Sequence, residues 1–141
     1  MPAFDLPLDE LRAYAGRNPR PGDLDAYWDA ALGELADVAP RADVVPVEHP
    51  STAAECFDVT YDGVGGARVY AKHLRPRDRS RRTGQAVAVF HGYSGSSPDW
   101  FDLLPWVAQG FSVLAMDVRG QGGRSTDVGG VVGNTLQGHI I

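Results

Sequence analysis

The runs Ala86-Val87-Ala88-Val89-Phe90 and Phe111-Ser112-Val113-Leu114-Ala115-Met116 decide how this sequence folds. Each run is apolar, continuous and of strand length, which is typical of strands covered on both faces. Residues 97–110 between them begin with Ser-Pro, continue with apolar residues at helical spacing and end in glycine, so we expect a helix capped by the serine. Pro105 should kink or restart this helix. A helical crossover between two strands makes a βαβ unit, and the sequence therefore predicts an α/β fold with parallel pairing.

The first forty residues predict one amphipathic helix. Asp23 can cap it by accepting a main-chain amide of the first turn. Apolar residues recur at three- and four-residue intervals over residues 24–35, and Pro40 marks the end. Tyr27 and Trp28 fall within this pattern, and we interpret them as core packing rather than as a ligand platform.

Residues 44–74 change to short β-branched and aromatic runs, with alternating polarity at 57–61 and 68–71. The glycine-rich segment 62–66 between these runs supplies residues able to adopt positive φ. The pattern predicts an antiparallel hairpin that precedes the βαβ unit.

Composition excludes several classes of function. Hydrophobic residues make up 43% and charged residues 22% of the 141 residues, which is ordinary for a globular domain. The net charge of -5 argues against nucleic-acid binding, and we interpret the basic run Arg75–Arg82 as a solvated loop rather than a polyanion site. The single cysteine, Cys56, fits a reducing compartment, and neither a signal peptide nor a membrane-spanning run is evident, so we expect a cytoplasmic protein. The four histidines show no close metal-binding pair, and no metal is predicted.

The turn that follows the first strand is His91-Gly92-Tyr93-Ser94-Gly95. Ligand sites of parallel sheets lie beyond the carboxyl ends of the strands, so this turn is a candidate site. In α/β-hydrolases a His-Gly turn of this type supplies one amide of the oxyanion hole, and the main-chain amide of Tyr93 is the candidate donor. The alternative is an ordinary strand-to-helix turn, which the two residues His91 and Gly92 alone do not exclude.

The turn that follows the second strand is Asp117-Val118-Arg119-Gly120-Gln121-Gly122-Gly123-Arg124-Ser125. It is similar to the D-x-R-G-x-G-x-S pattern of many α/β-hydrolases, with one residue inserted before the final Arg-Ser. Arg119 should pair with carboxylates or carbonyls and hold loops in place, so we assign it a structural role rather than a catalytic one.

Two partial motif matches are rejected. In Gly92-Tyr93-Ser94-Gly95-Ser96 the second glycine comes one place too early for a G-x-S-x-G nucleophile elbow, so we do not expect Ser94 to be a nucleophile. Gly120-Gln121-Gly122 does not continue into a dinucleotide fingerprint, because position 125 is serine and no acidic residue follows about twenty residues on. No nucleotide cofactor is predicted.

The sequence resembles carbohydrate esterase family seven, the acetyl xylan esterases and cephalosporin C deacetylases, over nearly its whole length. The matching segments are FDLPL at 4–8, the Pro-x-Asp-Leu helix start with Tyr27-Trp28, HGY at 91–93, RGQ at 119–121 and GNTLQGH at 133–139. The coincidence of RGQ with HGY carries the resemblance, because each motif is weak alone.

The resemblance implies that residues 1–141 are the N-terminal portion of a single α/β-hydrolase domain, cut before the nucleophile elbow. The family implies cytoplasmic serine esterases without a cofactor, usually homohexamers, that deacetylate short xylo-oligosaccharides and cephalosporin C. Their serine nucleophile, histidine and aspartate all match positions beyond Ile141, so His139 is not the catalytic histidine and only the oxyanion donor maps here, onto Tyr93. His91, Gly92 and the turn at 119–121 are implied to be structural residues near the site.

The shortness of the chain leaves two interpretations open. One is an interrupted esterase, and the other is a non-catalytic scaffold or binding subunit. An open frame after codon 141 that encodes G-x-S-x-G would support the esterase. The resemblance also implies that the nucleophile-bearing strand lies beside residues 86–90, so the isolated chain should expose an open strand edge and aggregate.

Overall fold

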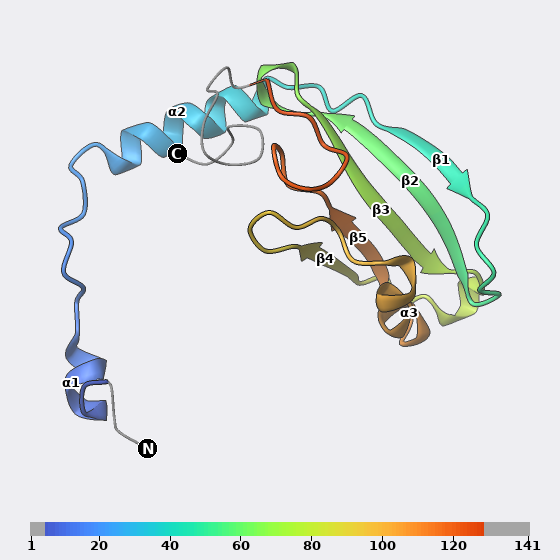
Figure 1. The fold of residues 1–141 in the computed structure, drawn as a ribbon, viewed down its shortest axis with the longest axis horizontal. Helices are drawn as coiled ribbons and strands as arrows, with labels where there is room; N and C mark the ends of the chain where they lie inside the picture. The colour runs from blue at the N-terminus through green and yellow to red at the C-terminus, as the bar shows by residue number, and fades with distance from the viewer. Residues whose placement is uncertain (1–4, 129–141) are drawn as a thin grey trace. The chain divides into compact units, whose positions relative to one another are not determined.

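The computed structural model describes residues 5–128, and Figure 1 shows the course of the chain. The chain divides into two compact units, Met1–Gly33 and Glu34–Ile141. That residues 1–141 form part of one domain stays a prediction. The elements are α1 (Leu8–Ala13), α2 (Leu24–Ala36), β1 (Asp43–Val47), β2 (Ala54–Asp62), the 3-10 turn η1 (Val64–Gly66), β3 (Arg68–Pro76), the 3-10 turn η2 (Arg79–Arg81), β4 (Ala86–Phe90), α3 (Trp100–Ala108) and β5 (Ser112–Met116).

The helix predicted from the apolar pattern of residues 24–35 is present as α2. It begins directly after Asp23, whose carbonyl accepts the amide of Tyr27 at 2.9 Å. The prediction that Tyr27 and Trp28 are core residues is wrong, because their side chains are 66% and 55% exposed and contact each other edge to face. Helical periodicity identifies an apolar face but not whether anything covers it. No helix within residues 5–128 is long and apolar enough to cross a membrane.

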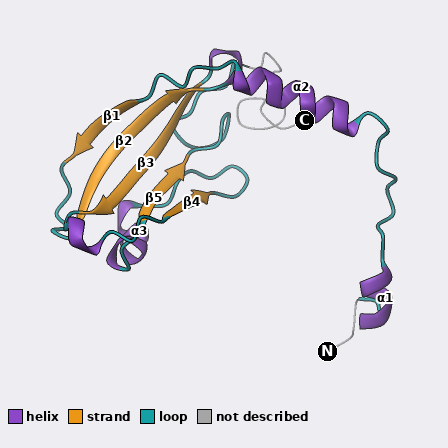
Figure 2. Cartoon of the chain, turned by 180° about the vertical axis from the view of Figure 1, so that it is seen from behind, coloured by secondary structure: helices purple, strands orange, loops and turns teal. Residues whose placement is uncertain are grey.

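The five strands form one sheet in the order β1-β2-β3-β5-β4, with β1 and β4 at the edges (Figure 2). The predicted antiparallel hairpin is β2 and β3, joined through η1, where Gly65 and Gly66 have φ of 69° and 80°. The predicted βαβ unit is β4, α3 and β5, and β4 pairs with β5 in parallel. The fold class is therefore α/β, as the sequence indicated, with β3 joining the two halves through antiparallel pairing with β5.

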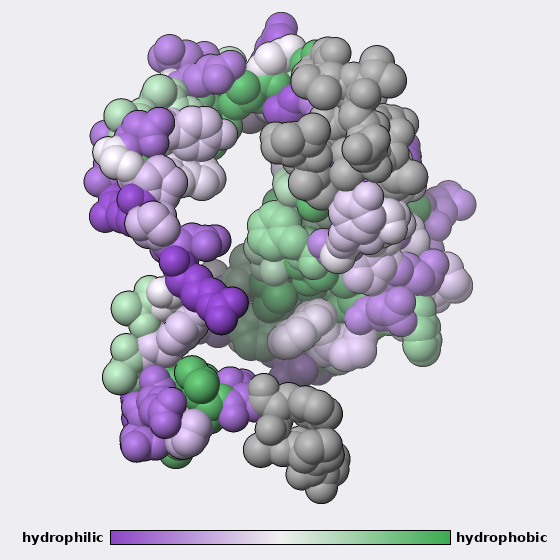
Figure 3. Space-filling model, turned by 60° about the vertical axis from the view of Figure 1, so that its left-hand side comes forward, coloured by the Kyte–Doolittle hydropathy of each residue, from purple (hydrophilic) through white to green (hydrophobic). Residues whose placement is uncertain are grey.

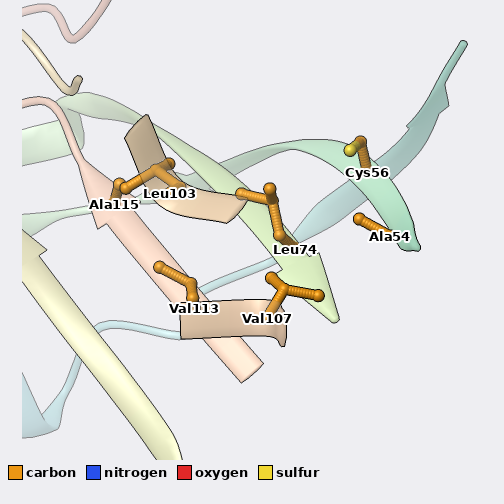
Figure 4. Close-up of a cluster of buried hydrophobic side chains, with 7 residues drawn as sticks. All are labelled: Ala54, Cys56, Leu74, Leu103, Val107, Val113 and Ala115. Atoms are coloured by element: carbon orange, nitrogen blue, oxygen red, sulfur yellow. The ribbon is translucent and has the colours of Figure 1, made fainter. Parts of the chain in front are cut away.

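The core lies between α3 and one face of the sheet. Leu103 and Val107 of α3 are 2% and 3% exposed and point toward the side chains of the strands (Figure 4). The cluster consists of Ala54, Cys56, Leu74, Leu103, Val107, Val113 and Ala115. The helix continues through Pro105, so it does not restart there. Its N-cap is Asp99 rather than the expected Ser97, since the Asp99 carboxylate accepts the amide of Phe101 at 3.0 Å.

The opposite face of β4 and β5 is exposed in the described part of the chain. Exposure alternates along β4, and Phe90 is 64% and Leu114 38% exposed. Figure 3 looks from the side on which β4 lies in Figure 1 and shows apolar surface on the unit that carries the sheet. The expectation that both apolar runs are covered on both faces is therefore wrong for residues 5–128. Only the α3 face of these strands is covered there.

The basic run is built into the fold rather than solvated throughout. Glu55 accepts hydrogen bonds from Arg75 at 2.6 Å and from Arg82 at 3.1 Å, and the hydrogen bond from Arg75 outweighs burial in lowering the pKa of Glu55. Arg81 donates to the carbonyl of Ala108 at the end of α3. The solvated-loop interpretation is thus wrong for Arg75 and Arg82, which pair with Glu55, whereas residues 77–81 are exposed, as that interpretation predicts.

Candidate active site at the ends of β4 and β5

Two turns meet at the carboxyl ends of the parallel pair. We call residues 91–97, after β4, the first turn and residues 117–125, after β5, the second turn. The amide of Gly122 donates to the carbonyl of Gly95 at 2.9 Å, and the amide of Val118 donates to Nε2 of His91 at 2.9 Å. A third bond runs from the amide of Ser94 to a side chain of the second turn, at 2.6 Å. Both turns that the sequence analysis identified therefore lie together at the carboxyl ends of β4 and β5.

Both ring nitrogens of His91 are hydrogen-bonded: Nε2 joins it to the second turn, and Nδ1 holds the first turn itself. Nε2 accepts the amide of Val118, so Nδ1 carries the proton and donates to the carbonyl of Gly92 at 2.7 Å. The Gly92 carbonyl also accepts the amide of Gly95 at 3.1 Å. Because the peptide bond between Gly92 and Tyr93 is planar and trans, two donors on this carbonyl also fix the opposite direction of the Tyr93 N–H.

The Tyr93 N–H is the one that the sequence assigned to the oxyanion hole. It has no hydrogen-bond acceptor within residues 5–128, and the Tyr93 side chain is 64% exposed. The donor is therefore held in a fixed direction and is unoccupied by the described residues. Its role in stabilising an oxyanion stays a prediction.

Ser94 has a backbone φ of 57°, in the left-handed region. A residue other than glycine costs about 1–2 kcal/mol there, and such strain clusters at functional sites. The Ser94 hydroxyl has no histidine partner within residues 5–128. The described residues thus supply no base for this serine.

The acceptor for the Ser94 amide is Oε1 of Gln121, whose residue is only 4% exposed. Gly120, with φ of 66°, allows the chain to turn just before Gln121. The main-chain N–H of Gln121 donates to the carbonyl of Val118 at 3.3 Å. Nε2 of Gln121 is buried and has no acceptor within the described part of the chain.

Asp117 anchors the second turn, a role that sequence reasoning did not assign. It is 2% exposed, and its carboxylate accepts the amides of Ser97 at 2.6 Å and Arg124 at 2.7 Å. Burial raises the pKa of Asp117, but the hydrogen bonds from Arg124 and Ser97 are among the interactions that together outweigh burial and leave the pKa below its ordinary value. The sequence contained a signal for this role, because Asp117 is the first residue of the D-x-R-G pattern. A Cβ at Gly123 would overlap this carboxylate, so the inserted position must be glycine.

Arg119 holds the end of the described segment, as expected for a structural arginine. Its guanidinium donates to Asp127 at 2.6 Å, and that carboxylate is 4% exposed. The Nε atom of Arg119 is buried without an acceptor within residues 5–128. The predicted pairing with a carboxylate is confirmed.

A polar pocket of about 440 Å³ lies beside the second turn, on the face of the sheet that α3 covers. Its charged groups are already hydrogen-bonded within the protein: Arg124 donates to Asp58 at 3.0 Å and stacks 3.9 Å over the ring of Tyr70. Burial and the hydrogen bond to Asp58 raise the pKa of Tyr70 to about 12. Lys72 donates to the carbonyl of Pro98. These polar groups of the pocket therefore bond other groups of the protein, and no metal-binding cluster occurs among the described residues.

Comparison with known proteins gives the family. A model of the family described as acetyl xylan esterase (AXE1) matches residues 1–141. The chain belongs to the acetyl xylan esterase family. The crystal structure of acetyl xylan esterase 1 from Thermoanaerobacterium sp. JW/SL YS485 is similar, with 51% identity, a TM-score of 0.85, and coverage of 96% of this chain. An acetyl xylan esterase from Paenibacillus sp. R4 has 32% identity, a TM-score of 0.75 and coverage of 91% of this chain.

The match covers only part of each relative, 42% of the first and 43% of the second. This chain therefore corresponds to the N-terminal part of the acetyl xylan esterase fold, as the resemblance implied. The segment at 133–139 that contributed to the resemblance, with His139, lies outside the described residues, as does Phe4.

Proposed function

We propose that this chain is the N-terminal part of a serine carboxylic ester hydrolase that removes acetyl groups from xylo-oligosaccharides or from cephalosporin C. The observation that carries the proposal is the Tyr93 N–H, which has no acceptor within residues 5–128 and is fixed in direction at the carboxyl ends of β4 and β5, where α/β proteins bind ligands. Family membership supports the ester substrate.

The proposed chemistry follows from what this donor can do. When a serine attacks the acetyl carbonyl, negative charge develops on the carbonyl oxygen, and a prepositioned N–H stabilises that charge more than it stabilises the substrate. Tyr93 would supply one such N–H. The serine, its histidine base and the orienting aspartate would come from the part of the relatives' fold that this chain does not span, together with the second oxyanion donor.

The remaining expectations of the family are part of the same proposal. They are a cytoplasmic location, a homohexamer and catalysis without a cofactor. The competing proposal is a non-catalytic scaffold or binding subunit.

The test uses residues 1–141 joined to the C-terminal part of the Thermoanaerobacterium esterase, which we call the chimaera. We expect it to hydrolyse p-nitrophenyl acetate and acetylated xylo-oligosaccharides. Tyr93→Pro deletes the donor, and proline suits the turn position before a residue with positive φ such as Ser94. We expect kcat to fall by about a hundredfold or more.

Tyr93→Ala is the matched control, because it keeps the amide and removes only the ring. It should keep kcat within about threefold of the unmodified chimaera, since the oxyanion contact is retained. Circular dichroism must show that both variants fold. Equal loss of kcat in both variants would assign the effect to the side chain and remove the Tyr93 amide from the mechanism. A folded but inactive chimaera would favour the scaffold.

A further inference from the structure

The side-chain amide of Gln121, in the second turn, accepts a hydrogen bond from the main chain of the first turn. Its acceptor atom lies 2.6 Å from the Ser94 nitrogen. A main-chain N–H can only donate, so the group facing it must be the carbonyl oxygen Oε1, and the orientation of the amide is settled by chemistry. The residue is 4% exposed, so water cannot readily replace it as the partner of Ser94.

The Ser94 N–H belongs to the peptide plane that follows Tyr93, whereas the Tyr93 N–H belongs to the plane before it. The plane before Tyr93 is held through the Gly92 carbonyl, which accepts from Nδ1 of His91 and from the amide of Gly95. The plane after Tyr93 is held by Gln121. With both planes fixed, the backbone at Tyr93 has little freedom left, and its N–H keeps one direction.

The nitrogen of the Gln121 side-chain amide makes no such bond within residues 5–128. Nε2 is buried and lacks an acceptor within residues 5–128, while Oε1 makes the short bond to Ser94. A buried amide with only its oxygen engaged points to the acceptor as the functional atom. The left-handed φ of 57° at Ser94 adds to this, because a strained residue persists only when its surroundings hold it.

We infer that Gln121 is a positioning residue for ester hydrolysis: by accepting the Ser94 N–H it keeps the Tyr93 N–H aimed at the developing oxyanion. This inference rests on the proposed function, since it assigns the Tyr93 amide to the oxyanion hole. Gln121 itself touches neither the ester nor the nucleophile in this scheme. Its effect is therefore expected on the transition state and not on the binding of substrate.

The test is Gln121→Met in the chimaera, because methionine keeps the volume and removes the strong acceptor. We expect kcat for p-nitrophenyl acetate to fall about tenfold with KM unchanged, since only a contact made in the transition state is weakened. The matched control is Gln109→Met, whose side chain lies exposed at the end of α3 and should leave both constants unchanged. An unchanged kcat in folded Gln121→Met, or a rise in KM alone, would overturn the inference.

A second measurement does not depend on activity. Amide hydrogen exchange followed by NMR should show the Ser94 N–H protected in the chimaera, at least tenfold less protected in Gln121→Met, and protected again in Gln121→Glu, which restores an acceptor oxygen. If the chimaera is inactive but this pattern holds, the proposed function fails while the hydrogen-bonding role of Gln121 stands. Unchanged Ser94 protection in Gln121→Met would refute that role even in an active enzyme.

Discussion

Replacing Gly122 by alanine should separate the two turns. A Cβ at this position would lie 2.5 Å from the carbonyl oxygen of Ser94 and 3.0 Å from that of Gly95, whereas ordinary contact begins at 3.4 Å. One turn must therefore retreat by about 0.9 Å. Both obstacles are main-chain atoms, so no flexible side chain can yield instead.

The magnitude follows from two contributions. Overpacking against main chain costs about 1–3 kcal/mol, and weakening the hydrogen bond from the Gly122 amide to Gly95 adds about 1 kcal/mol. We therefore expect Gly122→Ala to destabilise the chimaera by about 2–4 kcal/mol. Displacing the turn that carries Tyr93 by nearly 1 Å should also lower kcat between about tenfold and a hundredfold.

The assay is thermal unfolding together with hydrolysis of p-nitrophenyl acetate. The control is Gly33→Ala in α2, where an added Cβ meets nothing within 4 Å and alanine favours the helix. Gly33→Ala should keep kcat and should not lower the thermal midpoint. A Gly122→Ala variant with the midpoint and kcat of the unmodified chimaera would refute the close approach of the two turns.

Three further predictions concern pH, association and the chain alone. Burial, aided by the charges of Arg75 and Arg82, lowers the pKa of His73 below 6.5. The contribution of His73 to stability is therefore full above pH 6.5 and is lost as pH falls toward and through the folded pKa. Thermal midpoints of the chimaera should decline over that window, and they should decline less in His73→Gln. Light scattering should show that residues 1–141 alone associate at concentrations of tens of micromolar, and a stable monomer would contradict this. Phe90→Lys on the exposed strand face should weaken the association, whereas the helix control Phe101→Lys should leave it unchanged. The same chain should hydrolyse p-nitrophenyl acetate at the buffer rate, and turnover sensitive to serine reagents would show that Ser94 was wrongly rejected.

The sequence was informative wherever a local pattern decides the structure. The apolar runs and the helical spacing between them predicted β4, α3 and β5, because strand length and periodicity are local properties. The cap of α3 was misplaced for a tertiary reason. Ser97 and Asp99 are both good cap residues, but the buried Asp117 accepts the amide of Ser97 and so fixes Ser97 in the turn, and α3 begins only at Trp100, directly after Asp99.

The candidate site was predicted as two turns but not as one connected structure. The motifs located His91 and Gln121, yet the bonds that they make join residues 27 positions apart and depend on the parallel pairing of β4 with β5. The cover of Phe90 was mispredicted for a similar reason. An apolar run shows that a strand can be buried on both faces, but it does not show that the described chain provides both layers.

The two consecutive glycines of the second turn explain how these connections coexist. A side chain at Gly122 would strike the carbonyls of the first turn, and one at Gly123 would overlap the Asp117 carboxylate. The second turn thus packs closely against both the first turn and the buried side chain of Asp117. This position places the side-chain oxygen of Gln121 within hydrogen-bond distance of the Ser94 amide. A donor fixed before substrate arrives needs no reorganisation when charge develops. The direction of the Tyr93 N–H is therefore set by contacts within residues 91–125, before any nucleophile is considered.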